Sequence, residues 1–423
     1  MTRPRAAIVV TGSELVRGER TDLNGPFYAQ QALRLGLEPM RIEIVGDRPE
    51  ELEDALRNGL RADICFVSGG LGPTHDDRTA ELVAKVTGRG LRLDPELEAE
   101  IEGVSRAFAE RLKRPYADFA TGVAKQATLP EGAVSLGLAG TAPGLVVDAG
   151  DCVVVVLPGP PGELQRLWPR ALESEPVLRV LARAQPPVRR VLRFFGASES
   201  VVARALEQVG GDGEGVEATI CAHDFEIHVD LYAEPAAEPR AEALAAALRG
   251  ELARYLFSED ERPVEAIVLD LCRSRGLSLA TAESCTGGLV AGRLTSVPGA
   301  SDVFRGAVVA YSDDVKQREL GVSAALLAEH GAVSGETAAA MAQGVRERFG
   351  VDVAVAVTGV AGPGGGTPDK PVGLVFVHAA GPDGVLDVRF SFPGDRRTIR
   401  ARSAAAALHL VRRLLTQSRD ERV

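Results

Sequence analysis

The chain has 423 residues, of which 45% are hydrophobic and 25% charged, and its 48 basic residues stand against 59 acidic ones for a net charge of −11. The length suggests about three domains, and the composition is that of an ordinary globular protein. The acidic excess argues against binding of nucleic acid through a basic surface, but it does not exclude small anionic ligands in local pockets.

The N-terminal residues and the cysteines predict a cytoplasmic protein. No stretch approaches the roughly 18 consecutive apolar residues of a membrane span. The first residues lack the apolar region and cleavage site of a signal peptide. The cysteines are scattered and none form a C-x-x-C pair, so we expect neither a zinc site nor a disulfide framework. They are Cys65, Cys152, Cys221, Cys272 and Cys285.

Residues 1–170 alternate short apolar runs with helical patterns. The predicted strands are residues 6–10, 41–45, 64–67 and 152–157, and the predicted helices are residues 26–35, 49–60 and 79–86. This alternation predicts βαβ units and a parallel sheet. Turn residues follow several of these strands directly, and we expect such loops at the carboxyl edge of the sheet, where open α/β sheets bind ligands.

Residues 171–258 predict a small α+β module, a connector or a dimerisation element. Its expected strands are residues 188–195 and 225–232, and its expected helices are residues 198–209 and 239–256. The segment Gly210-Gly-Asp-Gly213 has the form G-x-x-G of an RNA-clamping loop. Asp212 and Glu214 would repel a phosphate there, and we interpret the segment as a surface hairpin turn.

Residues 259–423 return to an α/β pattern. Helices are predicted at residues 263–275 and 398–415, and strands at residues 277–281, 303–311 and 351–358. The whole chain is thus predicted to hold two α/β domains, residues 1–170 and 259–423, joined by an α+β module over residues 171–258.

Three N-terminal loops concentrate polar residues: residues 11–24, residues 68–77, and residues 140–144 with 158–163. Glycine allows close approach of a backbone to phosphate, and carboxylates beside such a turn suit a divalent metal that bridges a diphosphate. The alternative for the two aspartates near residue 77 is helix capping, and His75 is interpreted as a polar loop residue. The candidate metal ligands are Glu14, Asp22, Asp76 and Asp77, and the candidate substrate contacts are Asn24, Gly69, Gly70, Gly72 and Thr74.

The runs TGSELVRGERTDLN, SGGLGPTHDD, GTAPG and LPGPPGEL resemble the N-terminal domain of the CinA (competence/damage-inducible) family over residues 6–170. The resemblance implies a molybdopterin-binding-like fold and metal-dependent cleavage of a nucleotide diphosphate such as ADP-ribose. One departure is the stretch 135–139, where family members often carry an Asn-Pro or similar polar turn. The middle module resembles the KH-like connector of the family, which implies a homodimer.

The run Ala282-Glu-Ser-Cys-Thr-Gly-Gly288 follows a predicted strand and opens a helix. Ser284 or Cys285 could act there as a nucleophile, and the backbone N–H groups of Thr286, Gly287 and Gly288 could form an oxyanion hole. A serine nucleophile needs a base, and no histidine lies in a nearby motif. Only five of the 48 basic residues are lysines, and lysine can lose its proton where arginine cannot. Lys316 and Lys370 therefore stand out, each beside a loop that follows a strand.

The runs AESCTGG, YSDDVK, TGVAGPGGG, KPVG and GDRRTIR resemble the C-terminal CinA domain, which is similar to stand-alone nicotinamide-mononucleotide deamidases. The resemblance implies Ser284 as nucleophile with Tyr311 and Lys316 assisting, and no metal for this step. Cys285 remains the rival nucleophile because a thiolate is the better attacker. Candidate contacts to the substrate, beside the three amides above, are Gly362, Gly364, Gly365, Lys370, Arg396 and Arg400.

The resulting hypothesis is a bifunctional enzyme that acts on nicotinamide mononucleotide and on a diphosphate such as ADP-ribose, without direct nucleic-acid or membrane partners. Two alternatives remain. The N-terminal half could be a non-catalytic module that binds molybdopterin or a nucleotide, or the protein could serve in competence through a partner.

Overall fold

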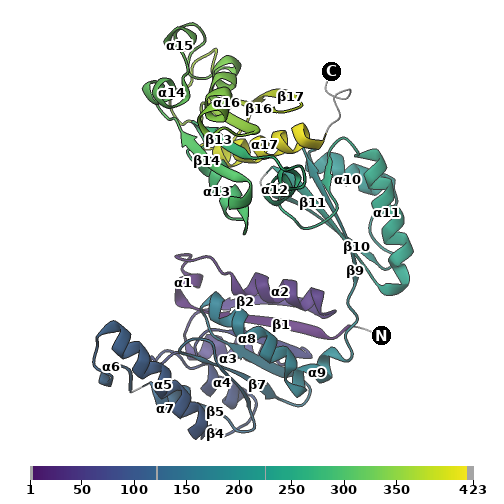
Figure 1. The fold of residues 1–423 in the computed structure, drawn as a ribbon. Helices are drawn as coiled ribbons and strands as arrows, with labels where there is room; N and C mark the ends of the chain where they lie inside the picture. Colours follow the sequence, from purple (N-terminus) through teal and green to yellow (C-terminus); the bar gives the residue numbers. More distant parts are fainter. Residues whose placement is uncertain (1–2, 121, 224, 417–423) are drawn as a thin grey trace. The chain divides into compact units, whose positions relative to one another are not determined.

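The computed structural model describes residues 3–120, 122–223 and 225–416. It divides into two compact units (Figure 1). The first comprises residues 1–188 with 233–238, and the second comprises residues 189–232 with 239–423. Within the described ranges, no helix has both the length and the apolar character needed to cross a membrane.

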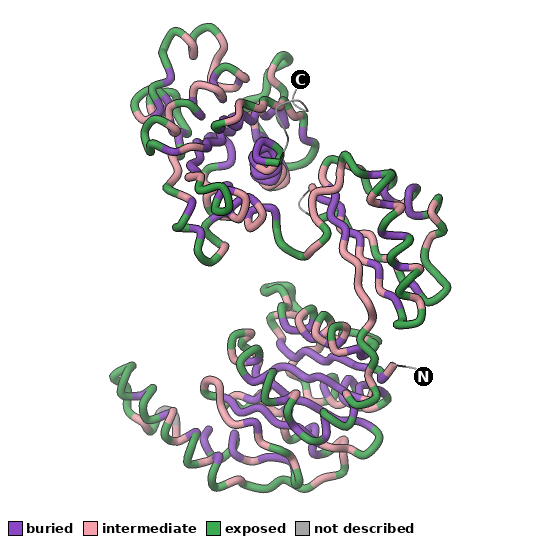
Figure 2. The backbone as a smooth tube through the Cα atoms, turned by 45° about the vertical axis from the view of Figure 1, so that its right-hand side comes forward, coloured by how far each residue is buried: buried purple, intermediate pink, exposed green. Residues whose placement is uncertain are grey.

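The first unit is built around a sheet with the strand order β2-β1-β3-β8-β7-β6. Its strands are β1 (Arg5–Thr11), β2 (Glu38–Val45), β3 (Ile64–Ser68), β6 (Val134–Leu138), β7 (Pro143–Asp148) and β8 (Val153–Leu157). β2, β1, β3 and β8 run parallel, as predicted, whereas β7 and β6 add an antiparallel edge. β3 and β8 are buried along their whole length, the pattern of strands covered on both faces, and the central strands are coloured as buried in Figure 2.

Helices cover both faces of this sheet, because alternate strand residues point to opposite sides. One face packs on α3 (Pro49–Gly59), α4 (Thr79–Val86) and α5 (Pro95–Leu112). The other packs on α2 (Asn24–Arg34), α8 (Pro161–Glu173) and α9 (Glu175–Leu181), with Tyr28 stacked on Phe66 at 5.2 Å between ring centroids. Shorter elements are α1 (Ser13–Val16), β4 (Leu91–Leu93), α6 (Ala117–Ala120), α7 (Val123–Gln126) and β5 (Thr128–Pro130).

The larger part of the second unit has a sheet of strand order β14-β13-β15-β16-β17. Its strands are β13 (Leu279–Glu283), β14 (Phe304–Val309), β15 (Val353–Gly359), β16 (Leu374–Gly381) and β17 (Gly384–Ser391). The first three in the order are parallel and the last two antiparallel. Its helices are α12 (Val264–Ser274), α13 (Leu289–Thr295), α14 (Asp313–Leu320), α15 (Ala324–His330), α16 (Gly335–Phe349) and α17 (Arg396–Thr416), with η2 (Ala300–Asp302). The α/β class predicted for both large parts is confirmed.

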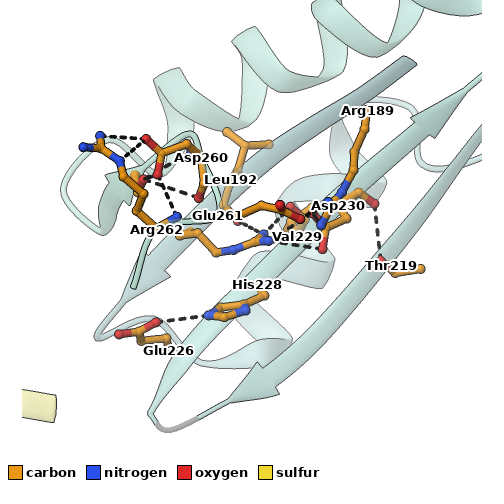
Figure 3. Close-up of polar contacts among 12 residues, drawn as sticks. Arg189, Leu192, Thr219, Glu226, His228, Val229, Asp230, Asp260, Glu261 and Arg262 are labelled. Carbon is orange, nitrogen blue, oxygen red and sulfur yellow. Dashed lines mark hydrogen bonds and ion pairs between the residues drawn. The ribbon is translucent and has the colours of Figure 1, made fainter. Parts of the chain in front are cut away.

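The small module contributes a sheet of order β10-β11-β9-β12, which confirms the α+β prediction. Its elements are β9 (Val188–Phe195), α10 (Glu199–Gln208), β10 (Val216–His223), β11 (Glu226–Ala233), η1 (Pro235–Ala237), α11 (Glu238–Glu251) and β12 (Leu256–Ser258). Arg189 and Arg193 of β9 both bind Asp230 of β11, at 2.9 and 3.1 Å (Figure 3). The G-x-x-G segment lies between α10 and β10 and ends in a tight turn, as predicted, where Gly213 and Val216 exchange backbone hydrogen bonds. The carbonyl oxygens of its first and last glycines accept hydrogen bonds from Arg240.

A buried polar cluster ties this module to α17 within the second unit. The Glu226 carboxylate accepts from His409 Nε2 at 2.8 Å and from His228 Nε2 at 3.0 Å, and the His409 ring stacks on Phe195. Burial lowers the pKa of His409 to about 4. Burial opposes ionisation of Glu226, but its hydrogen bonds with His228 and His409 lower its pKa to about 2. At neutral pH an ionised Glu226 thus binds a neutral His409, and the module braces the helix that begins at Arg396.

Candidate active site

The predicted C-terminal loops meet at the carboxyl edge of β14, β13 and β15. Ser284 directly follows β13, Tyr311 follows β14, and the glycine-rich loop follows β15. The register pairs Glu283 with Val309 on one side and with Val357 on the other. Ser284 N donates to Val357 O at 2.9 Å. The serine therefore lies at the sheet edge where β14, β13 and β15 end next to one another. Ligands of open α/β sheets bind at such an edge.

Ser284 and Cys285 have different surroundings. The Cys285 side chain, 4% exposed, belongs to the hydrophobic core with Val290 and Leu294. Burial raises the pKa of its thiol to about 12, against the opposing effects of nearby amides and Arg400. The thiol is therefore protonated near neutral pH and faces the core. Ser284 is also buried, with 8% of its surface exposed, and it is the protonated, core-packed state of the Cys285 thiol that favours the serine as the nucleophile.

Lys316 is nearly inaccessible to solvent, with 1% of its surface exposed, although it lies on the short polar helix α14. Its Nζ is 3.8 Å from Asp313 Oδ1. Burial lowers its pKa below the ordinary value, whereas the charges of Asp313, Cys285 and Tyr311 oppose this shift. A buried lysine whose pKa is lowered, within electrostatic reach of Cys285 in the turn that also carries Ser284, loses its proton more readily than an exposed lysine, which is the property required of a general base.

Two of the three amides that we expected to face an oxyanion are used inside the loop. Gly287 N donates to Ser284 O at 3.1 Å, and Gly288 N donates to Glu283 Oε2 at 2.8 Å. Their positive φ angles, 61° and 95°, require glycine and fold the chain back under the strand. At Thr286 the side chain also offers a donor. Its hydroxyl is fully buried and has no hydrogen-bond partner among the residues that the structure describes, which leaves it available to a ligand or a water molecule.

Arg396 and Arg400, expected to bind phosphate, cross-link the loops of the site. Arg400 donates to Cys285 O at 3.1 Å and to Thr286 O at 2.7 Å. Arg396, one helical turn earlier on α17, donates to Gly362 O at 2.8 Å and to the hydroxyl of Tyr311 at 2.5 Å. A guanidinium group has five N–H donors, so both retain donors for a ligand. Tyr311 itself is 58% exposed, at the mouth of the site rather than buried with Lys316.

Lys370 is used to hold the glycine-rich loop. Its Nζ donates to His330 O, at the end of α15, at 2.6 Å. In the loop itself, Gly362 and Gly365 have positive φ angles, and a Cβ added at Gly364 would meet open space. The loop is therefore anchored at its far end and remains open in its middle, where the predicted contact with a phosphate would occur.

The N-terminal loops also converge at the carboxyl edge of their sheet. The buried Asn24 amide donates to Ser68 Oγ at 2.8 Å and to Gly159 O at 2.7 Å, joining the loops after β3 and β8. Thr79 Oγ1 donates to Gly69 O, and a Cβ at Gly70 would lie 2.1 Å from that hydroxyl. Asn24 thus positions the glycine turn, and its amide nitrogen is occupied by the protein.

The four carboxylates predicted to bind a metal are not gathered into a cluster. Asp22 accepts from the backbone N–H groups of Asn24 and Gly25 and caps α2, and Asp77 accepts from Thr74 N at 2.9 Å. Asp76 and Glu14 are exposed, and the hydrogen bond of Asp76 with Thr74 lowers its pKa. In the part of the chain that the structure describes, no group of three or more His, Cys, Asp or Glu side chains is placed to hold a metal ion.

Sequence reasoning missed several residues of this N-terminal site. A cavity of about 220 Å³ is lined by Gly70, Gly72 and Asp77, as expected, and also by Lys125 and Gln126. Gln126 donates to Leu71 O and Thr141 O, and Lys125 to Thr74 O. Asp47, in the loop after β2, accepts from Thr11 at the end of β1 and from Ser13 in α1. The scarcity of lysine in this chain is a sequence signal that would have drawn attention to Lys125. No such signal marks Gln126, because the residues it contacts are distant in the sequence.

Comparisons with known proteins agree with this architecture. Family profiles described as the probable molybdopterin binding domain, the damage-inducible protein CinA KH domain and the CinA C-terminal domain match residues 7–179, 189–258 and 261–415. The chain is 46% identical over 422 residues to a CinA-like protein of Mycolicibacterium gilvum, covering 97% of this chain and 99% of the relative. It is 43% identical over 422 residues to a CinA-like protein of Mycobacterium tuberculosis, covering 97% of each.

Among solved structures, the competence/damage inducible protein CihA from Agrobacterium tumefaciens is 40% identical, with a TM-score of 0.36, and the match covers 38% of this chain and all of that one. The profiles define a protein with a molybdopterin-binding-like domain, a KH module and a second α/β domain in one chain. The chain belongs to the CinA family. This membership supports an enzyme of the CinA type.

Proposed function

We propose that the second unit hydrolyses the carboxamide of nicotinamide mononucleotide to nicotinic acid mononucleotide and ammonia. The observation that supports this most is Lys316, a buried lysine with a lowered pKa. Lys316 lies on the helix that follows β14, and Ser284 follows β13, the strand paired with β14. The Cys285 side chain belongs to the hydrophobic core. A serine paired with a lysine that can lose its proton is a recognised arrangement for attack on an amide.

In the proposed reaction, Lys316 Nζ takes the proton of Ser284 Oγ, which attacks the carboxamide carbon. The C=O π bond opens to a tetrahedral oxyanion, and its collapse breaks the C–N bond as Lys316 returns the proton to the departing ammonia. Tyr311, whose hydroxyl oxygen accepts from Arg396, can relay this same proton: its O–H donates to the leaving group as the phenol oxygen takes the proton held by Lys316. Water then hydrolyses the acyl ester by the same path in reverse. No step requires a metal.

The direct test is release of ammonia from nicotinamide mononucleotide by the full-length protein in the presence of a chelator. We expect ammonia and nicotinic acid mononucleotide in equal amounts, with turnover unchanged by the chelator because no step uses a metal. Both products can be quantified, the nucleotide by chromatography and ammonia by a coupled assay. Absence of ammonia release from nicotinamide mononucleotide would contradict the proposal.

The first unit carries a second proposal, metal-dependent cleavage of a nucleotide diphosphate such as ADP-ribose. It is supported by the cavity beside Gly70 and Gly72, at the carboxyl edge of a parallel sheet. The carboxylates do not form a preassembled cage, so their arrangement suits an ion such as Mg²⁺, which keeps several waters and shares one or two carboxylates with substrate phosphates. Asp76 and Asp77 would hold it. When bound, the ion would neutralise charge on the diphosphate.

For this second proposal, we expect release of AMP from ADP-ribose only when Mg²⁺ or Mn²⁺ is added. Asp76→Ala should lower the rate at least tenfold, because it removes an exposed carboxylate beside the glycine turn. Asp54→Ala, which removes an exposed carboxylate on α3, is the matched control and should leave the rate unchanged. If no metal supports cleavage and Asp76→Ala alters only affinity for ADP-ribose, the first unit is a binding module.

A further inference from the structure

Glu283, the last residue of β13, is a carboxylate with no exposed surface next to the proposed nucleophile. Its Oε2 accepts from Gly288 N at 2.8 Å and Val290 N at 3.1 Å. Its Oε1 accepts from Ala291 N at 2.8 Å and from the hydroxyl of Thr281 at 3.3 Å. Both oxygens are thus occupied by donors of the chain itself, and neither faces solvent.

A fully buried carboxylate is costly unless hydrogen bonds compensate its lost hydration. Bonds from backbone N–H groups to a carboxylate are charge-assisted and strong. The amides that Glu283 binds are those that open α13, immediately after the loop 284–288. The strand end and the helix start are therefore joined through one side chain, and the loop between them has little freedom.

The Ser284 loop is held from two sides. Inside the fold, Glu283 fixes the amide of Gly288, where the loop ends. On its other side, Arg400 binds the carbonyl oxygens of Cys285 and Thr286. Ser284 is itself bound through its N–H to β15 and through its carbonyl to Gly287. We infer that Glu283 is a positioning residue for Ser284, an inference that rests on the proposed deamidase function.

Substitution by glutamine has a predictable outcome, because the two oxygens have different partners. A glutamine with its NH₂ group at the Oε1 position keeps the bonds to Gly288 and Val290. It loses only the bond from Ala291, since the Thr281 hydroxyl can rotate to accept. Aspartate retains the charge but is one methylene too short to reach the same amides. Alanine removes every bond.

The test is the turnover of nicotinamide mononucleotide by Glu283→Gln, Glu283→Asp and Glu283→Ala. We expect kcat to fall about tenfold for Gln and about 100-fold or more for Asp and Ala, with KM within about threefold of the native value, because small misplacement of a reacting group lowers kcat strongly. The matched control is Glu265→Gln, which breaks a different buried pair, 2.8 Å from Arg293 on α13. It should lower the melting temperature without loss of kcat.

Hydrogen exchange separates failure of this inference from failure of the proposed function. If the native protein does not deamidate the nucleotide, the proposed function fails, while the amides of Gly288, Val290 and Ala291 still report on Glu283. We expect these amides to be protected in the native protein, Ala291 to exchange faster in Glu283→Gln than in Glu265→Gln, and all three to exchange faster in Glu283→Ala. The inference is overturned by unchanged protection in Glu283→Ala, by a kcat in Glu283→Gln equal to that of the control, or by Asp retaining more activity than Gln.

Discussion

Replacement of Ser284 by alanine is expected to lower the deamidation of nicotinamide mononucleotide by at least ~10³-fold, because it removes the oxygen that attacks the carboxamide. Replacement of Cys285 by alanine is expected to leave kcat within about threefold of the native value. The reason lies in their surroundings, since the thiol of Cys285 is packed in the core and burial raises its pKa to about 12. Ammonia release under saturating substrate measures both variants.

Stability measurements keep this comparison interpretable. Cys285→Ala leaves a small cavity in the core, so we expect its melting temperature to fall while its kcat is retained. Ser284→Ala removes a single hydroxyl oxygen from a small side chain that is 8% exposed, leaves its backbone bonds in place, and should melt close to the native protein. Full activity in Ser284→Ala together with inactivity in Cys285→Ala, at a temperature where both are folded, would reverse the assignment of the nucleophile.

The sequence was informative where function depends on local pattern. Ser284, Tyr311 and the glycine-rich loop each follow an apolar run, and parallel strands bring their carboxyl ends to one edge, so their proximity was predictable. The scarcity of lysine drew attention to Lys316, which the structure shows to be buried. The antiparallel strands at the sheet edges were not, because an apolar run does not encode strand direction.

What the sequence could not predict are contacts between distant residues. Arg400 binds carbonyl oxygens 114 and 115 residues earlier, and Asn24 reaches Gly159 across 135 residues. An arginine that will join loops and one that will bind phosphate look identical in a sequence. Glu283 differs from these, because a carboxylate that ends an apolar strand and precedes a Gly-Gly turn is a local signal for a buried cap.

These contacts change how the proposed chemistry of the second unit is to be tested. Arg396 holds both Tyr311 and Gly362, so its removal would disturb the mouth of the site as well as any phosphate contact. A loss of affinity in an Arg396 variant would therefore not identify the phosphate ligand. Variants of Ser284 and Lys316 are more decisive, because neither side chain hydrogen-bonds the other loops in the described structure.

Substitution of Lys316 by methionine is expected to lower kcat by about 10²–10⁴-fold, the usual contribution of a general base. Lys316→Arg should be equally impaired, because a guanidinium does not give up its proton at working pH. Lys316→Met should nonetheless be more stable than the native protein at neutral pH, since a buried ammonium is replaced by an apolar chain of similar length. Turnover and melting temperature, measured on the same samples, separate catalysis from folding.

The sign of the stability change depends on pH. Burial holds the folded-state pKa of Lys316 below its ordinary value of 10.5, so between these two values the unfolded chain binds more protons than the folded one. Native stability therefore carries a penalty that is complete below the folded pKa and disappears as the pH rises toward 10.5. The advantage of Lys316→Met should shrink over the same interval. An advantage that does not change with pH would show that Lys316 is not a titrating buried amine.

The pH dependence of catalysis tests the same residue independently. If neutral Lys316 is the base, kcat/KM rises with pH until the lysine is deprotonated. Asp313, 3.8 Å from Nζ, stabilises the ammonium form, so Asp313→Asn should lower the pKa of Lys316 further and move the acidic limb to lower pH. Asp314→Asn, which removes an exposed carboxylate paired with Arg318, is the control and should not move it. An acidic limb that stays in place in Asp313→Asn would assign the base to another group.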